Sequence, residues 1–246
     1  MTASLEKLDE HFFTYRKSSP YDDAMRHYTF ETFRPYLDRQ QGTALEFGCS
    51  DGQMTEMIAS CVEKLDVVEG SKQFIQKAQE RKIPNASFTH SLFEFFSSAK
   101  KYDYIFASYV LTHISDLKLF FTKVKELLNA DGLFFAAVPN SRTLSRQLAQ
   151  NMGLLDDLFS LSENDKNHGH CRPYDRVRLN KDLDNNGFIM IAQGGIILKP
   201  LADFQMDKLI QDEILKKEQM DGLYKLGMEY PDLSAAIYAV CKKNNL

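Results

Sequence analysis

Short apolar runs and longer amphipathic stretches alternate along the chain, which predicts strands and helices in turn. The run at 133–138 is nearly all apolar, which is typical of a strand in a parallel sheet covered on both faces. We therefore expect an α/β protein with a mostly parallel sheet and a late strand pair. The predicted strands are 43–47, 65–69, 86–90, 102–108, 133–138, 188–198 and 235–242.

Apolar residues three and four positions apart predict the helices between these strands. The sequence Asn-Ala-Asp-Gly at 129–132 marks the end of one helix, and Gly187 ends another. The apolar residues of the last predicted helix, 203–229, form a stripe that would either cover the sheet or form a dimer interface. The predicted helices are 22–39, 53–59, 117–128, 175–186 and 203–229, besides a leucine-rich helical stretch that begins at Leu144.

The turn after the first predicted strand is the most informative stretch of the chain. Residues 44–52 read ALEFGCSDG, so a strand breaks into glycines and small residues just before a helix begins. Gly48 and Gly52 allow backbone angles that a Cβ would forbid, and a ligand can lie against bare main chain there. Glu69 ends the next strand 17 residues after Gly52, near the spacing at which an acidic side chain meets a ribose diol. This pattern predicts a nucleotide-binding βαβ unit.

The residues of this turn separate two kinds of ligand. A dinucleotide site needs G-x-G-x-x-G, whereas here Gly48, Ser50 and Gly52 follow Glu46. A carboxylate at that place repels a phosphate and attracts an ammonium or sulfonium centre. The segment resembles the first motif of class I S-adenosylmethionine-dependent methyltransferases, acid-x-Gly-x-Gly-x-Gly, with Ser50 in place of the middle glycine. The resemblance covers roughly residues 25–243 and implies a Rossmann-like seven-stranded, mostly parallel sheet with helical insertions.

The same resemblance implies S-adenosylmethionine as cofactor and S-adenosylhomocysteine as product. In that family the turn after the third strand lies over the adenine, where Ser91 and Leu92 match best and Phe93 is next. The usual aspartate is missing there, and the alternative is that Leu92 and Phe93 belong to the core. The implied cofactor-binding residues are Glu46, Phe47, Gly48, Cys49, Ser50, Gly52, Glu69, Gly70, Ser91, Leu92, Phe93, Ser108 and Tyr109.

His113 follows the fourth predicted strand, whose carboxyl end should border the ligand crevice. It falls where related small-molecule methyltransferases have a histidine. An imidazole can take a proton from a hydroxyl or ammonium nucleophile as the methyl group moves. The alternative is a histidine that packs against the following helix, since many of these enzymes work by holding the reactants in line.

The polar segment 162–174 is too long for a simple turn, and long loops on the crevice side usually carry function. We expect Arg172 to clamp an anion and His170 or Tyr174 to hydrogen-bond the substrate, so that all three line one cavity with His113. A loop held by its own hydrogen bonds is the alternative. A zinc site at His168 and His170 lacks the paired ligand spacing, and no metal is expected.

The segment 194–206, GGIILKPLADFQM, adds a second resemblance. Together with the G-H-x-R-x-Y loop before it, this segment looks like bacterial methyltransferases associated with surface polysaccharide and secondary-metabolite pathways. That resemblance implies a small polar acceptor. Lys199 is then either a partner for a substrate phosphate or carboxylate, or a surface lysine over an apolar strand.

Composition narrows the function further. The 246 residues carry a formal net charge of −4 and show no basic stripe, so a nucleic-acid partner is not expected. The four cysteines form no C-x-x-C pair and are interpreted as reduced thiols of a cytoplasmic protein without membrane spans. The expected organisation is one methyltransferase domain, 1–246, with an N-terminal helical cap at 1–40 and insertions at 141–175 and 200–232, as a monomer or homodimer.

These patterns together predict methyl transfer to oxygen or nitrogen of a small polar, possibly anionic metabolite. A nicotinamide-dependent oxidoreductase is disfavoured by Glu46. A protein or RNA methyltransferase is disfavoured because the chain has no basic face and no Asn-Pro-Pro-Tyr-like tetrapeptide after the fourth strand. A catalytically silent relative that binds the cofactor and acts through a partner is the remaining alternative.

Overall fold

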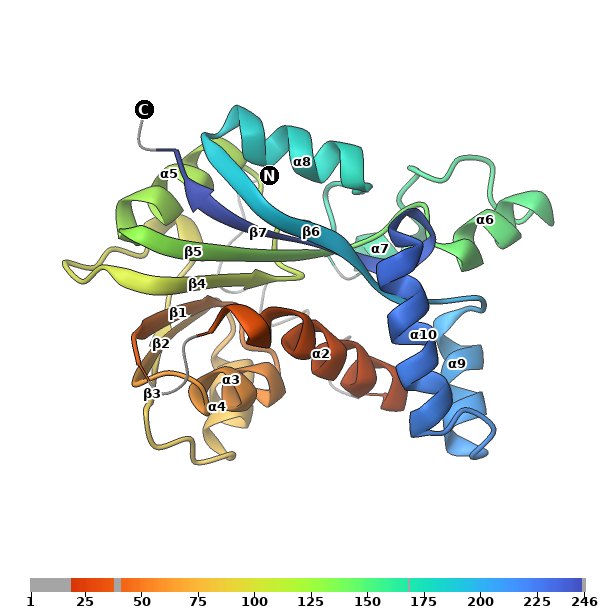
Figure 1. Cartoon of the computed structure of the whole chain (residues 1–246), viewed down its shortest axis with the longest axis horizontal. Coiled ribbons are helices and arrows are strands. Elements are labelled where there is room, and N and C mark those ends of the chain that lie inside the picture. Colours follow the sequence, from red (N-terminus) through yellow and green to blue (C-terminus); the bar gives the residue numbers. More distant parts are fainter. Residues whose placement is uncertain (1–18, 38–40, 168, 245–246) are drawn as a thin grey trace.

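One seven-stranded sheet organises the computed structural model, which describes residues 19–37, 41–167 and 169–244 (Figure 1). The strand order is β3-β2-β1-β4-β5-β7-β6, and β7 alone runs antiparallel to its neighbours. The predicted fold class, a mostly parallel Rossmann-like sheet, is confirmed. The strands are β1 Thr43–Phe47, β2 Lys64–Glu69, β3 Ala86–His90, β4 Tyr102–Ser108, β5 Leu128–Pro139, β6 Phe188–Leu198 and β7 Ser234–Lys243.

Helices cover both faces of the sheet, and each face has its own core. One core joins the sheet to α2, α3, α4, α9 and α10, and the other joins it to α5 and α8. The described helices are α2 Pro20–Phe33, α3 Gln53–Ala59, α4 Lys72–Gln79, α5 Leu117–Leu127, α6 Leu144–Asn151, α7 Glu163–Asn167, α8 Arg176–Asn185, α9 Asp203–Gln211 and α10 Lys217–Glu229, with 3-10 turns at Arg34–Tyr36, Phe93–Phe95 and Pro231–Leu233.

The strands agree with the sequence prediction except at the start of β5. That strand begins at Leu128, whose backbone pairs with Tyr102 before an irregularity in the register. Asn129 donates a hydrogen bond from Nδ2 to Asp103 Oδ1 at 2.6 Å, which fastens the expected helix-ending turn to β4. The turn therefore both ends α5 and extends the strand.

Two helices differ from the prediction for local reasons. The stretch expected at 22–39 begins at Pro20 with Ser19 as its N-cap and ends at Phe33, because Pro35 disfavours further α-helix before it. The stretch expected at 203–229 is two helices. Glu213 lies between them with φ 56°, a left-handed conformation that ends α9.

Helix α2 packs against both α9 and α10, which come from the far end of the chain (Figure 1). The Tyr28 hydroxyl donates to Asp221 at 2.7 Å, and its ring stacks on Tyr224 at a centroid distance of 4.9 Å. The Tyr21 backbone N–H donates to Asp207 at 2.9 Å. These contacts fix the position of α2, whose Thr29 meets Tyr109 at the carboxyl end of β4.

The expected insertion 141–175 contains α6 and α7, and the expected insertion 200–232 contains α9 and α10. Of the expected N-terminal cap, residues 1–18 and 38–40 lie outside the described residues. No helix in the described part of the chain is long and apolar enough to cross a membrane.

Candidate active site

The turn after β1 has the backbone geometry that its glycines predict. Gly48 and Gly52 have φ values of 80° and 81°, and Ser50 between them lies at 48°. The Gly52 N–H donates to the Cys49 carbonyl at 2.8 Å, which closes the turn just before α3. Ser50 replaces the expected glycine at the cost of a left-handed backbone, a conformation that concentrates at functional sites.

The neighbours of these glycines give a second reason why no side chain is present at either position. A Cβ built on Gly48 would lie 2.6 Å from Cγ1 of Val110, and one on Gly52 would lie 2.8 Å from Cβ of Ala78. The two glycines thus bring the turn against the loop after β4 and against α4. A side chain at either position would therefore disturb this packing as well as any ligand contact.

Glu69 at the end of β2 ties the two predicted cofactor turns together. Its Oε2 accepts from the Cys49 N–H at 3.0 Å and its Oε1 from the Ser71 N–H at 2.9 Å. Burial raises the pKa of Glu69, while the backbone N–H groups of Ser71 and Cys49 oppose that rise. The carboxylate therefore lies at the glycine turn, which is the place that a ribose diol requires.

Glu46, expected from the sequence as a carboxylate that attracts a cationic centre, is buried in the folded chain. The side chain is 1% exposed, and its Oε2 accepts from the Thr55 hydroxyl on α3 at 2.6 Å. Burial raises the pKa of Glu46 to about 8, and the nearby Glu69 adds to the rise. The group is therefore mostly protonated at pH 7, and its Oε1 is buried without a partner.

The turn after β3 is fastened to the end of β2. The Ser91 N–H donates to the Glu69 carbonyl at 3.1 Å, and His90 Nε2 lies 2.9 Å from the Gly70 carbonyl oxygen. The Ser91 hydroxyl donates to the Leu92 carbonyl at 2.9 Å, so in this structure it does not point freely at a base. The turn sits at the expected edge of the sheet.

Phe93 was expected either beside the adenine or in the core, and its contacts agree with both positions. The ring packs against Phe47 at a centroid distance of 5.4 Å, as a core residue does. Its Cζ also lies 3.6 Å from the Cβ position of Gly48, so the ring borders the glycine turn. Phe93 thus belongs to the core where the core meets the predicted cofactor site.

The end of β4 carries an unpaired buried hydroxyl and a strained tyrosine. Ser108 Oγ is buried without a partner. Tyr109 has φ 64°, and its hydroxyl lies 2.7 Å from that of Thr29 on α2. Burial raises the pKa of Tyr109 to about 12, which keeps the phenol neutral. Tertiary contacts therefore hold Tyr109 in a conformation that a bulky residue rarely adopts.

The residues at this edge fit S-adenosylmethionine. Buried oxygen atoms without partners occur at Glu46 and Gln53 beside the glycine turn and at Ser108 on the adjacent strand. Such atoms are costly unless a ligand or water satisfies them. The acidic Glu69 and the acceptor atoms suit the hydroxyl and ammonium groups of this cofactor. Glu46 would release its proton on pairing with a cation, because its raised pKa reflects burial without one.

The loop 169–174 lies against the loop after β4, and this contact brings two predicted residues together. The Cys171 N–H donates to the Thr112 carbonyl at 2.8 Å. As a result, the rings of His113 and His170 meet edge to face, with centroids 4.9 Å apart. Part of the predicted group of four therefore assembles at the carboxyl edge of the sheet.

Arg172 and Tyr174 lie differently from the expectation that they face the substrate. The Arg172 guanidinium donates through one nitrogen to the carbonyls of Ile114 and Ser115, at 2.6 and 3.1 Å. Tyr174 is 1% exposed and donates to Asp182 at 3.0 Å, within the core under α8. Arg172 thus holds the loop in place through the two carbonyls, and Tyr174 anchors it to the core through Asp182.

Two further predictions concern Lys199 and a metal site. Lys199 Nζ pairs with Asp203 at 2.6 Å, within the start of α9. No group of three His, Cys, Asp or Glu side chains suited to a metal ion occurs among the described residues, and His168 lies outside them.

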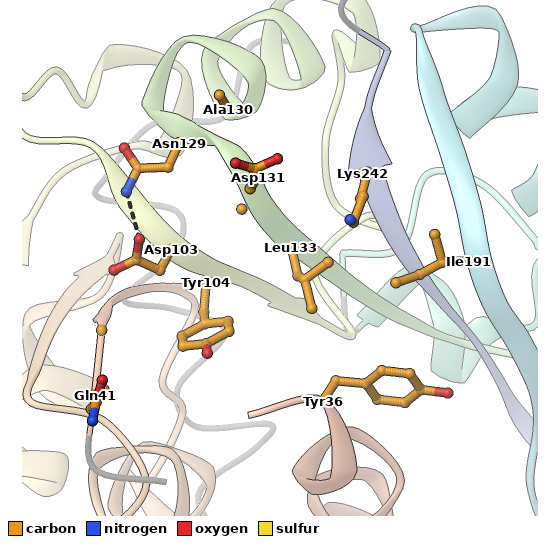
Figure 2. Close-up of a pocket in the computed structure, with 12 residues that line it drawn as sticks. Tyr36, Gln41, Asp103, Tyr104, Asn129, Ala130, Asp131, Leu133, Ile191 and Lys242 are labelled. Carbon is orange, nitrogen blue, oxygen red and sulfur yellow. Dashed lines mark hydrogen bonds between the residues drawn. The ribbon is translucent and has the colours of Figure 1, made fainter. Parts of the chain in front are cut away.

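A cavity of about 790 Å³ opens at the opposite, amino edge of the sheet (Figure 2). Asp103 and Asn129 are hydrogen-bonded to each other on its wall, and Lys242 reaches it from β7. None of the predicted site residues lines it. In an open α/β sheet the ligand site lies at the carboxyl ends of the strands, so this cavity is not the candidate active site.

Four residues of the site were missed by the sequence reasoning. Thr55 and Thr29 reach Glu46 and Tyr109 from helices, and Asp165 accepts from His170. Tyr21 has a buried hydroxyl without a partner near the start of α2. Thr55 lies one helical turn into α3 on its inner face, which was a usable signal. The others depend on contacts between distant segments.

Comparisons with known proteins agree with this geometry. The profile of the methyltransferase domain family matches residues 21–193. Nodulation protein S of Bradyrhizobium diazoefficiens is 30% identical over 94 residues, which are 37% of this chain and 45% of that protein. The matched part thus spans less than half of the curated relative.

Solved structures show the same fold at low identity. N-methyltransferase NodS from Bradyrhizobium japonicum WM9, in complex with S-adenosyl-L-homocysteine, is similar with a TM-score of 0.60 and 13% identity, covering 97% of this chain and 96% of that one. The DhpI–SAH complex gives a TM-score of 0.62 at 13% identity, covering 98% and 94%. These likenesses establish the fold.

Proposed function

Because the chain belongs to the methyltransferase domain family, whose methyl donor is S-adenosylmethionine, we propose that it methylates an oxygen or nitrogen atom of a small polar metabolite. The family, the fold and the cofactor expected from the sequence are thereby confirmed. The observation that carries the finer proposal is the set of unpaired buried oxygens of Glu46 and Ser108, next to Glu69, at the carboxyl ends of adjacent strands.

The cofactor residues divide the binding task. When bound, S-adenosylmethionine supplies a methyl group on a sulfonium sulfur. Glu69 accepts hydrogen bonds from ribose hydroxyls, and the Gly48–Gly52 turn forms the floor of the site. Phe93 and Leu92 border the adenine. The Ser108 hydroxyl and the unpaired Oε1 of Glu46 are the remaining polar partners, near the amino acid part of the cofactor.

The acceptor side is formed by segments that converge on the end of β4. Tyr21 and Thr143 carry buried hydroxyls without partners, from the start of α2 and from the residue before α6. Such hydroxyls suit an acceptor that has several polar groups. Arg172 is already bonded to two carbonyls, so no anionic group on the acceptor is required.

His113 is the proposed base. It lies three residues beyond Val110, which packs against the glycine turn at Gly48. The His113 N–H donates to the Val110 carbonyl at 2.9 Å, so the two residues form one tight turn. A base at this place takes the proton that an O–H or N–H nucleophile loses on methylation.

The names of the relatives give an order for testing acceptors. NodS is an N-methyltransferase, and DhpI has been solved as a complex with SAM and HEP. An amine acceptor is therefore the first to try. Glucosamine is a suitable probe because it offers an amine and several hydroxyls in one small molecule.

Two measurements test the proposal. Calorimetry should show S-adenosylhomocysteine binding at micromolar affinity and no binding of NAD. Transfer of a tritiated methyl group from S-adenosylmethionine should be found with at least one of a panel of amino sugars, sugars and small amines. Cofactor binding without transfer to any of them would instead support the catalytically silent relative.

A further inference from the structure

His113 and His170 come from segments far apart in the sequence and are held against each other by the backbone. Besides the Cys171 N–H, the Cys171 thiol lies 3.1 Å from the Thr112 carbonyl oxygen. Arg172 adds bonds to the carbonyls of Ile114 and Ser115. The edge-to-face contact of the two imidazoles, with an interplanar angle of 69°, is therefore built into the packing of two loops.

Asp165 on α7 fixes the orientation of His170. Its Oδ1 lies 3.2 Å from His170 Nδ1, and its backbone carbonyl accepts from the His170 N–H at 2.9 Å. The other carboxylate oxygen accepts from the backbone N–H and the hydroxyl of Ser162, at 2.9 and 2.7 Å. Arg146 on α6 lies 3.6 Å from the same oxygen. Both oxygens are thus engaged.

The carboxylate stays ionised in this setting. Burial by itself would raise the pKa of Asp165, but hydrogen bonds from His170 and Ser162 outweigh it and hold the pKa well below its ordinary value. The cation Arg146 pairs with this carboxylate, and Arg172, two residues after His170, bonds the carbonyls of Ile114 and Ser115. An ionised Asp165 accepts from Nδ1–H of His170 and so leaves Nε2 of that ring as its other reactive atom.

We propose that Asp165 is a positioning residue that fixes the ring of His170 and, through it, the ring of His113 for proton removal from the methyl acceptor. The inference rests on the proposed function of His113. In the step, the acceptor N–H or O–H bond breaks and the proton forms a bond to the His113 imidazole. The electron pair left on the acceptor atom forms the new bond to the methyl carbon as the methyl–sulfur bond breaks.

The alternative is that Asp165 only caps α7 and holds the loop. Asp165→Asn separates the two, because asparagine keeps the size and the possibility of bonding Ser162 but loses the charge. Asp156→Asn is the matched control, since Asp156 is exposed in the segment that precedes α7. Thermal unfolding with S-adenosylhomocysteine present checks that each variant folds and binds.

The first readout is the imidazole nitrogen spectrum of the full chain, which needs no acceptor. Asp165→Asn should reduce the Nδ1–H form of His170 and shift the signals of His113, with no such change in Asp156→Asn. His170→Gln should shift the His113 signals in the same way. Unchanged His113 signals in Asp165→Asn would overturn the inference while leaving the methyltransferase proposal intact.

The second readout is the rate of methyl transfer to whichever acceptor of the panel is methylated by the wild-type protein. Glucosamine is tried first. Asp165→Asn should lower kcat about 10-fold or more and alter its pH profile, with KM for S-adenosylmethionine nearly unchanged. The double variant Asp165→Asn/His170→Gln should be no worse than His170→Gln alone. A wild-type kcat in Asp165→Asn, or additive losses, would refute the positioning role. If no acceptor of the panel turns over, the proposed function fails and the spectra still decide the geometry.

Discussion

At the scale of single residues, Glu46 shows how burial changes the chemistry of a motif. The sequence places a carboxyl at the end of β1, and its pKa of about 8 compares with 4.5 for an ordinary glutamate. Between these values the folded chain holds a proton that the unfolded chain releases. The contribution of this carboxyl to stability is therefore present below about pH 4.5 and is lost as the pH rises through about 8.

Glu46→Gln should accordingly flatten the dependence of stability on pH in the protein without cofactor. The amide cannot ionise, so the variant should gain on the order of 4 kcal/mol over wild type between pH 5 and pH 9, at roughly 1.4 kcal/mol per unit of pKa shift. Urea unfolding at several pH values measures this. Glu63→Gln, at an exposed carboxyl, is the control. Parallel pH curves for wild type and Glu46→Gln would contradict the buried proton.

Gly48 gives a second prediction at this scale, with another glycine as its control. Both Gly48 and Gly153 have positive φ, at 80° and 73°, but only Gly48 has a neighbour in the way of a Cβ. Gly48→Ala should therefore lose about 2–4 kcal/mol of stability through strain and contact with Val110, and Gly153→Ala only about 1 kcal/mol. Equal losses in urea unfolding would show that Val110 does not limit the turn.

At the scale of elements, the loop 169–174 is held by contacts with other segments, among them the loop after β4. Arg172→Ala removes two hydrogen bonds to the Ile114 and Ser115 carbonyls. Amide hydrogen exchange should then become faster in both loops while the strands stay protected. Lys181→Ala, on exposed α8 surface, should leave both loops unchanged. Faster exchange confined to 169–174 would mean that Arg172 orders its own loop alone.

At the scale of the whole molecule, the site joins segments as far apart in the sequence as Thr29 and His170, so ligand binding should stabilise the fold as a unit. S-adenosylhomocysteine at 100 times its Kd should add about 2.7 kcal/mol to the free energy of unfolding. In Glu69→Gln this gain should fall at the same ligand concentration, because the ribose loses a charged acceptor. NAD should produce no shift in thermal unfolding. An undiminished gain in Glu69→Gln would exclude Glu69 as the ribose ligand.

The local parts of the fold were predictable because they depend on neighbours in the sequence. Strands β1, β3, β4 and β6 have the predicted bounds, since apolar runs between polar turns specify them. The glycine turn also follows from local backbone freedom. The break between α9 and α10 was missed, because a left-handed Glu213 leaves no pattern in the apolar stripe.

By itself, the sequence determined the family, the seven-stranded sheet, the cofactor and the edge at which Glu69 and the glycine turn meet. Only the tertiary structure decided where individual side chains point. Tyr174 turns to Asp182, Arg172 to two carbonyls, and His113 to a His170 held by Asp165. The physical reason is that spacing in the chain sets backbone geometry, whereas the partner of a polar side chain is whichever group the packing of distant segments brings within hydrogen-bond reach.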